Sequence, residues 1–168
     1  MGDEPKGTDF VISRVFDAPR ERVWWTLTDI EAMKHWWPPV GFTMFTGNLD
    51  LRPGGFFHGG IKSFEGYKMW GKFVYQEIVP PERLVFVNSF ANAAGEAARH
   101  PIMPTWPLET LATLTLDEEA GGKTKVTVRW VPHNASELER KTFDAGHVGL
   151  KATWNGIFDR IAAHMAKG

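Results

Sequence analysis

The chain has 168 residues and a formal net charge of -1, which suits one compact domain and gives no net positive field to hold nucleic acid. Because it has no cysteine, disulfides, thiol nucleophiles and cysteine-ligated metal sites are excluded. Aromatic residues are unusually frequent, with eight tryptophans, two tyrosines and twelve phenylalanines making up 13% of the chain. A functional interpretation has to account for this aromatic content.

The N-terminal residues are polar. We expect a disordered lead-in over residues 1–8, followed by a single domain over residues 9–168. No stretch approaches the roughly 20 apolar residues of a membrane span, and the N-terminus lacks the apolar segment of a signal peptide. We therefore expect a cytoplasmic protein with no membrane span.

The domain is predicted to begin with a strand over residues 9–16, which is rich in β-branched and aromatic residues. Pro19 ends the strand and is well tolerated in the first turn of a following helix. Asp29 can cap a second helix, and Pro38 and Pro39 end it. Two short helices are thus expected after the first strand.

Three pairs of strand-like runs follow, and the residues between the runs of each pair are typical of turns. The pairs are residues 42–51 with 56–61, residues 67–79 with 83–90, and residues 108–116 with 124–131. Hairpins of this kind predict a six-stranded antiparallel meander. With the first strand added, the sheet is expected to be curved and to have about seven strands.

Residues 91–107 contain three prolines and five alanines and have no sustained periodicity, which predicts a loop that allows one helical turn at residues 93–99. The loop is longer than most connections in compact domains. Such loops are either ordered lids and binding loops or disordered insertions, and the sequence leaves both interpretations open.

The C-terminal segment has the strongest helix signals. Ser136 and Glu139 match a capping box, and residues 150–165 carry a continuous apolar stripe at helical spacing. Gly146 and Gly149 predict a break or kink in this segment. The whole order predicts an α+β fold in which an antiparallel sheet curls around one long helix, with a cavity between them.

Several segments, in this order, are similar to those of one known family. They are Phe16-Asp17-Ala18-Pro19-Arg20-Glu21-Arg22-Val23-Trp24, Trp36-Trp37-Pro38, Leu51-Arg52-Pro53-Gly54-Gly55-Phe56, Glu77-Ile78-Val79-Pro80-Pro81-Glu82-Arg83-Leu84-Val85, and Thr153-Trp154-Asn155 with Phe158-Asp159-Arg160-Ile161. Their order and spacing over about residues 9–166 resemble the AHSA1-like (Hsp90-ATPase-activator-like) branch of the SRPBCC, or START and Bet v 1-like, superfamily. The chain departs from the family at Thr153, where glycine is common, and in the longer loop. The resemblance implies a helix-grip fold with a hydrophobic cavity, but no particular chemistry, because the superfamily includes carriers, receptors, cyclases and co-chaperone domains.

The aromatic residues are dispersed over nearly every predicted element, as expected if the elements converge on one cavity. The alternative is that they fill a solid core. On the first interpretation, the ligand-binding residues are Trp36, Trp37, Phe42, Phe56, His58, Tyr67, Trp70, Phe73, Phe86, Asn88, Trp106, Trp130, His147 and Trp154.

Two of the six histidines are candidates for acid–base chemistry. His58 would lie in the cavity if its face of the strand is concave, and otherwise on a solvated face. His147 would point toward the cavity from the upper end of the long helix, or would lie at the helix break. Together with a carboxylate such as Glu65, Glu77 or Glu109, they would form the smallest acid–base set for a cyclase or dehydratase.

The function expected from these features is non-catalytic binding of a small hydrophobic or aromatic molecule, with His58, Tyr67 or Asn88 orienting its polar end. The alternative is a polyketide cyclase or dehydratase that uses His58 and His147 as catalytic residues. The resemblance also implies a less favoured co-chaperone role linked to Hsp90. No metal is expected, because the histidines lack metal-ligand spacing, and no cofactor is expected because no phosphate-binding loop is present. The oligomeric state is left open, and a homodimer is compatible with the sequence.

Overall fold

The structure is a computed structural model and describes residues 9–167. The lead-in predicted for residues 1–8 lies outside the described residues. The strands are β1 (Phe10–Phe16), β2 (Phe42–Asp50), β3 (Phe56–Ser63), β4 (Lys68–Val79), β5 (Arg83–Ala91), β6 (Ala97–Ala98), β7 (Glu109–Glu119) and β8 (Lys123–His133). The helices are α1 (Arg20–Thr28), α2 (Ile30–Trp36), α3 (Glu137–Ala145) and α4 (His147–Ala166).

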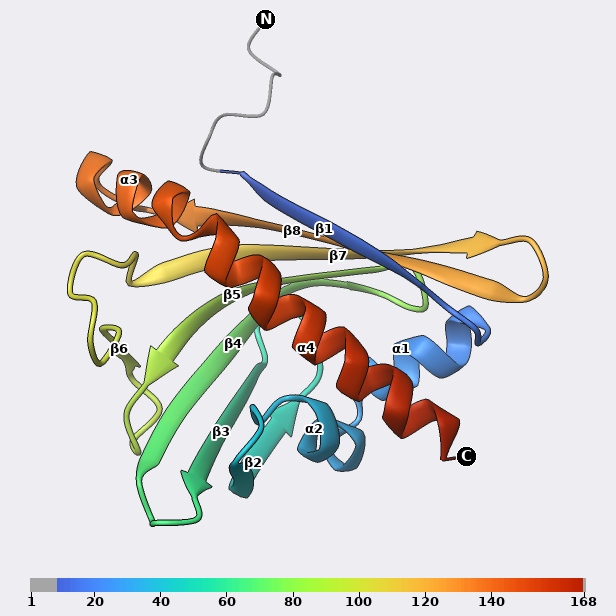
Figure 1. Cartoon of the computed structure of the whole chain (residues 1–168), viewed down its shortest axis with the longest axis horizontal. Helices are drawn as coiled ribbons and strands as arrows, with labels where there is room; N and C mark the ends of the chain where they lie inside the picture. Colours follow the sequence, from blue (N-terminus) through green and yellow to red (C-terminus); the bar gives the residue numbers. More distant parts are fainter. Residues whose placement is uncertain (1–8, 168) are drawn as a thin grey trace, which may run out of the picture.

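The strands form one curved antiparallel sheet in the order β1-β8-β7-β5-β4-β3-β2, and α4 crosses one face of it (Figure 1). We call the face that α4 crosses the inner face. Strand β1 pairs with β8 along its whole length, from Phe10 opposite Trp130 to Phe16 opposite Thr124. The predicted helix-grip fold is therefore confirmed, with β6 as an eighth strand beside β5.

The two short helices after β1 are also as predicted, and hydrogen bonds join them. The Asp29 carboxylate accepts from the first backbone amides of α2, at 3.0 and 3.2 Å, and so caps that helix. The indole Nε1 of Trp36 donates to the carbonyl oxygen of Thr26 in α1 at 2.7 Å. Arg160 of α4 donates to the carbonyl of Trp36 at 3.0 Å, so the long helix is tied to the same corner.

The C-terminal helical segment is broken at Gly146, as expected. The capping box of Ser136 and Glu139 begins α3, and Gly146 ends it. A Cβ atom at Gly146 would lie only 2.8 Å from Cζ3 of Trp106, so the absence of a side chain lets the segment before β7 approach the helix. Gly149 lies within α4 and does not interrupt it.

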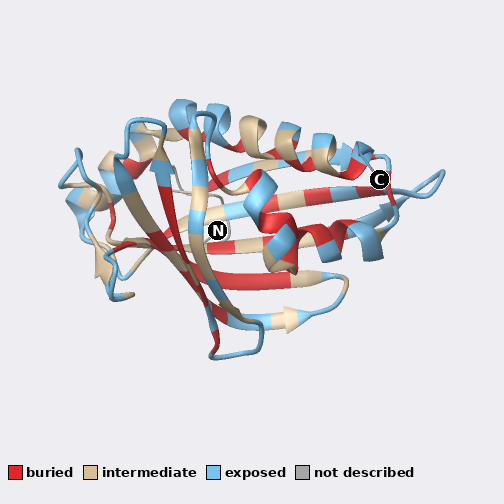
Figure 2. Ribbon diagram, turned by 90° about the horizontal axis from the view of Figure 1, so that it is seen from below, coloured by how far each residue is buried: buried red, intermediate tan, exposed pale blue. Residues whose placement is uncertain are grey.

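The core lies between the inner face and α4. Figure 2 shows buried residues in α4 and in the strands that it crosses. The predicted apolar stripe supplies this contact, because its buried members recur every three to four residues along α4. They are Leu150, Trp154, Phe158, Ile161 and Met165.

Among the described residues, no helix combines the length and the hydropathy needed to cross a bilayer.

The helical turn predicted at residues 93–99 is wrong. The side-chain oxygen of Asn92 accepts from the amides of Ala94 and Glu96, at 3.0 and 2.9 Å, and this makes a tight turn through Gly95. The chain then runs back as β6 and pairs with the end of β5. The local side-chain hydrogen bonds and the glycine, whose φ is +88°, outweigh the helix preference of the alanines.

Candidate functional site

A cavity of about 400 Å³ lies beneath the N-terminal half of α4. Its walls come from β5, β7, β8, the segment of residues 99–108 that precedes β7, and the first turns of α4. The lining residues are Asn88, Ser89, Phe90, His100, Met103, Trp106, Pro107, Leu108, Thr110, Trp130, Gly146, Gly149, Leu150 and Thr153. We call it the main cavity. Gly149 and Thr153 are exposed, so they mark its mouth.

A second, smaller cavity of about 70 Å³ lies deeper, toward α2. It is lined by Leu27, Trp36, Trp37, Phe73, Leu84, Phe86, Asn88, Leu114, Trp130, Trp154 and Ile157. Asn88 and Trp130 line both cavities, so the two adjoin. The two cavities lie between the mouth beside Gly149 and the corner held by Trp36.

The lining has few polar groups. Within residues 9–167, no Asp, Glu, Lys or Arg side chain lines either cavity. The Asn88 amide nitrogen and the Thr110 hydroxyl lie 3.4 Å apart, so these two polar groups face each other. A charged ligand would lose its hydration here without gaining a countercharge, whereas a neutral apolar molecule would meet matching walls.

The structure brings eight of the predicted ligand-binding residues to the two cavities, from seven different elements or connections. These eight residues are Trp36, Trp37, Phe73, Phe86, Asn88, Trp106, Trp130 and Trp154. Phe73 stacks on Phe86 with ring centroids 4.0 Å apart, and Trp130 meets Trp154 edge to face at 5.7 Å. The aromatic residues therefore pack against one another and also line cavities, so both interpretations of them hold in part.

His58, Phe56 and Trp70 lie on the outer face of the sheet, so the expectation that they share the cavity is wrong. The imidazole of His58 stacks on Trp70 with centroids 5.2 Å apart, and its Nε2 lies 3.0 Å from the carbonyl of Asn92. Side chains alternate along a strand, and Phe57 faces inward, where it packs against Trp37. Its neighbours on β3 must therefore face outward.

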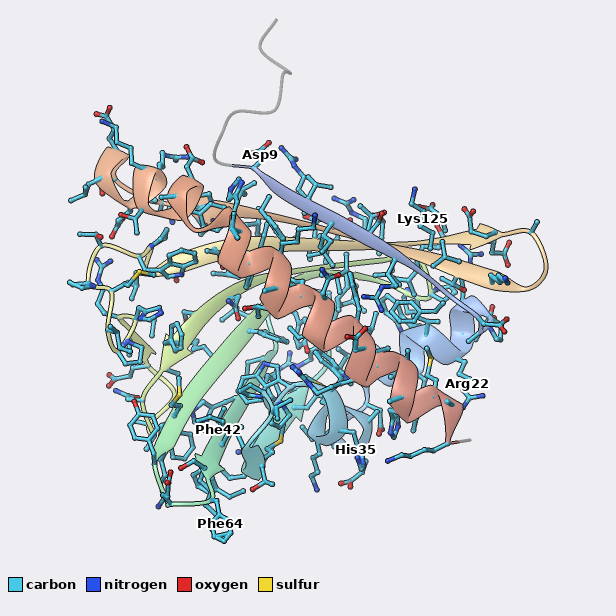
Figure 3. The ribbon with its side chains drawn as sticks, in the orientation of Figure 1. Asp9, Arg22, His35, Phe42, Phe64 and Lys125 are labelled. Carbon is cyan, nitrogen blue, oxygen red and sulfur yellow. The ribbon has the colours of Figure 1, made fainter. Side chains whose placement is uncertain are left out.

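Three further predicted residues lie outside both cavity linings as described. Tyr67 is 56% exposed in the turn before β4. Phe42 begins β2, away from α3 (Figure 3), and is in neither cavity lining. His147 lies behind the cavity at the start of α4, where its ring contacts Phe10 and Phe143 with centroids 5.6 and 5.3 Å away.

The predicted acid–base set does not assemble. His58 is on the outer face, whereas His147 lies on the inner side under α4, so no single substrate atom can contact both. Nε2 of His147 lies 3.9 Å from the carboxylate of Asp144, and Glu77 instead pairs with Arg83 at 2.8 Å. Within residues 9–167 no group of three or more His, Asp or Glu side chains is placed to hold a metal ion.

His100 is a cavity residue that the sequence analysis missed. Its ring contacts Phe90 and Trp106 edge to face, with centroids 5.0 and 6.3 Å away. Its Nδ1 accepts hydrogen bonds from the backbone amides of Ile102 and Met103, both at 3.0 Å. Burial lowers the pKa of His100, which favours the neutral ring. No sequence motif marks this histidine, because its contacts with Phe90 and Trp106 depend on how the segment before β7 turns back over the sheet.

Residues 99–107 form the roof of the main cavity and are fastened to α3. Arg99 pairs with Glu139, and the Thr142 hydroxyl donates to that of Thr105 at 2.9 Å. A backbone hydrogen bond from Ser136, followed by the Arg99 guanidinium, lowers the pKa of Glu139, so this carboxylate is ionised over the neutral range. The long loop of the sequence is thus an ordered connection with its own anchors.

The family described as "Activator of Hsp90 ATPase homolog 1-like protein" matches this chain over residues 17–166. The chain belongs to this AHSA1-like family. The resemblance seen in the sequence is therefore confirmed, and it covers almost all of the described residues. No curated protein matches the chain.

Solved structures agree with the AHSA1-like fold. A Rhodobacter sphaeroides protein is 19% identical with a TM-score of 0.77, covering 98% of this chain and 96% of its own. A Nitrosomonas europaea protein is 21% identical with a TM-score of 0.74, covering 98% and 97%. The AHSA1 protein of Silicibacter pomeroyi is 16% identical with a TM-score of 0.69, covering 94% and 97%. At these identities the likeness establishes the fold, and the chemistry of the AHSA1-like cavity has to be argued from its own residues.

Proposed function

We propose that the protein binds a small, uncharged hydrophobic or aromatic molecule in the main cavity, without catalysing a reaction on it. The observation that carries this proposal is the cavity of about 400 Å³ itself, whose described lining is mostly apolar and contains no ionic side chain. Ligand pockets of about 300–1,000 Å³ enclose molecules of drug size. The smaller adjoining cavity extends the space for a ring or a short alkyl group.

The aromatic walls support the binding of a flat molecule. Trp106 covers the cavity from the roof, and Trp130 forms its floor on β8. Large rigid rings give much contact area and lose little conformational entropy when they bind a ligand. The aromatic content that stood out in the sequence thus includes the surface offered to the ligand.

The arrangement of titratable groups favours binding over catalysis. General acid–base chemistry needs two groups of suitable pKa within hydrogen-bonding reach of the reacting atoms. Among the described residues that line the main cavity, His100 is the one titratable side chain, and its Nδ1 is occupied by two backbone amides. A single histidine held in this way supplies a hydrogen bond, but not an acid–base pair.

The proposal is tested by closing the mouth of the cavity. Gly149 lines the mouth, and a Cβ added there meets no heavy atom within 4 Å, so Gly149→Leu is designed to place a bulky side chain at the mouth. The matched control is Val148→Leu, because Val148 is the neighbouring residue on α4 and is 84% exposed. Neutral flavonoids, steroids and aromatic polyketides are screened by thermal shift and calorimetry.

We expect a ligand present at about 100 times its Kd to stabilise the wild-type protein by about 2.7 kcal/mol. The Val148→Leu protein should show the same stabilisation, whereas Gly149→Leu should lose most of it. The proposal is wrong if no compound raises the melting temperature of the wild type. It is also wrong if Gly149→Leu binds every compound as tightly as the control does.

A further inference from the structure

We propose that His100 is the polar anchor of the main cavity and donates a hydrogen bond from Nε2–H to an uncharged acceptor oxygen of the ligand. Ketones, quinones, esters and lactones supply such an oxygen. This inference rests on the proposed function and narrows it, because it assigns a specificity-determining residue and a chemical class to the same site.

The hydrogen bonds of His100 decide which ring nitrogen carries the proton. Nδ1 lies 3.0 Å from the amide nitrogens of both Ile102 and Met103, and both amides donate to it. A nitrogen that accepts these bonds cannot also carry a proton. A neutral imidazole has one N–H group, which in His100 must therefore be on Nε2.

The position of the ring makes this N–H available to a ligand. His100 lines the main cavity between Phe90 and Trp106, which hold the ring edge to face on two sides. Within residues 9–167, no group accepts a hydrogen bond from Nε2. Its direction is fixed by the Nδ1 contacts and by the two aromatic rings, so the donor is already oriented before a ligand binds.

The remaining polar groups indicate what this donor recognises. Asn88 and Thr110 bond each other, and no described lining residue carries a permanent charge. The indole Nε1 of Trp130 is a second donor in the lining, buried and without an acceptor among residues 9–167, and it too favours an uncharged acceptor oxygen. A carboxylate ligand would therefore lose its hydration without meeting a cation. A pure hydrocarbon would cover Nε2–H and leave it without an acceptor, at a cost. A neutral carbonyl oxygen avoids both penalties.

The ionisation of His100 agrees with this assignment. Burial lowers the pKa of the ring. Arg99, the neighbouring cation, is engaged by Glu139 on α3. Protonation of Nδ1 would also turn it toward two N–H donors and disrupt the turn at Ile102 and Met103. Near neutral pH, His100 is therefore a neutral donor with one defined tautomer.

Three probes that share one aromatic skeleton test the ligand class by isothermal titration calorimetry at neutral pH. They are methyl naphthyl ketone, ethylnaphthalene and naphthoate. We expect the ketone to bind the wild-type protein about tenfold more tightly than ethylnaphthalene, as one satisfied buried hydrogen bond predicts. Naphthoate should bind more weakly than the ketone.

Two substitutions distinguish the two roles of His100, which are donation from Nε2–H to the ligand and acceptance at Nδ1 from the amides of Ile102 and Met103. In His100→Asn, the side-chain oxygen replaces Nδ1 as the acceptor for the amides of Ile102 and Met103, but nothing reaches the position of Nε2. In His100→Gln, the amide group reaches toward the position of Nε2 and can donate there, while the Nδ1 acceptor is lost. We expect His100→Asn to bind ketone and hydrocarbon within about twofold of each other, and His100→Gln to keep most of the preference.

Each other outcome overturns the inference in a recognisable way. If ketone and hydrocarbon bind the wild type equally, or if naphthoate binds best, the anchor is wrong while cavity binding stands. If His100→Asn keeps the preference and His100→Gln loses it, His100 only supports the turn. If none of the probes binds the wild type, the proposed function and the anchor are both overturned.

Discussion

Tyr75 carries a phenolic hydroxyl into the core. The side chain is 1% exposed, and no hydrogen-bond partner for its hydroxyl occurs within residues 9–167. Burial raises its pKa, because a phenolate would be desolvated there. We therefore expect Tyr75→Phe to raise the free energy of unfolding by about 1 kcal/mol, since it removes an unsatisfied polar group. Urea denaturation measures this change in the free energy of unfolding, and Tyr67→Phe is the control because Tyr67 is exposed. A clear loss of stability in Tyr75→Phe would show that the Tyr75 hydroxyl has a hydrogen-bond partner.

His58 and His100 show what the sequence around a single residue can and cannot predict. The sequence did not decide which face His58 occupies, because Phe56 and Phe57 offer an aromatic side chain to each face, and the glycines that follow give no contrast in polarity. His100 was missed because its contacts with Phe90 and Trp106 form only after the roof segment has folded over the sheet. The residue type showed that each histidine could titrate or form hydrogen bonds. Its surroundings depended on which face of β3 His58 occupies and on how the segment around His100 turns.

Helix α3 has two separable roles at the level of elements, since it begins with a capping box and it anchors the roof of the cavity. Glutamine can replace glutamate in a capping box, so Glu139→Gln removes the charge that pairs with Arg99 and keeps the cap. We expect faster hydrogen exchange over residues 99–107, by a factor of up to about five, because exposed ion pairs contribute at most about 1 kcal/mol. Exchange over α3 itself should change little.

The matched variant is Ser136→Ala, which removes the cap and keeps the Arg99–Glu139 pair. It should destabilise the start of α3 by about 1 kcal/mol and speed exchange there. If both variants loosened the same residues, the cap and the anchor would not be separate.

Most helices and strands could be predicted from the sequence, whereas β6 and the path of the segment before β7 could not. The hairpins, both short helices and the break at Gly146 follow from turn residues, caps and periodicity, which are local signals. Strand β6 was not predicted, because the Asn92 side chain and Gly95 redirect an alanine-rich stretch that favours helix. Apart from Trp106, the cavity lining within residues 99–108 was not predicted, because the path of this segment depends on contacts of Arg99 and Thr105 with α3.

The stability of the whole molecule should depend on pH through the contact between α2 and the end of α4. His164 stacks on His35 with ring centroids 4.6 Å apart, and Arg22 and Lys167 lie nearby (Figure 3 labels Arg22 and His35). Burial lowers the pKa of His164, and repulsion from His35, Lys167 and Arg22 lowers it further. Burial likewise lowers the pKa of His100.

The direction of the effect follows from proton linkage. In the unfolded chain both histidines titrate near their ordinary pKa of about 6.5. Because their folded-state pKa values are lower, the unfolded chain binds more protons as the pH falls below that value, and folding stability must decrease. The melting temperature should therefore be constant above about pH 7 and should fall between about pH 6.5 and 5.

Variants assign this pH dependence to the α2–α4 contact. His164→Gln cannot take up the proton, so its melting temperature should fall less steeply over the same range than that of the wild type. His133→Gln, on β8 and outside the cluster, is the control and should follow the wild type. A His164→Gln curve parallel to the wild type would refute the role of this contact.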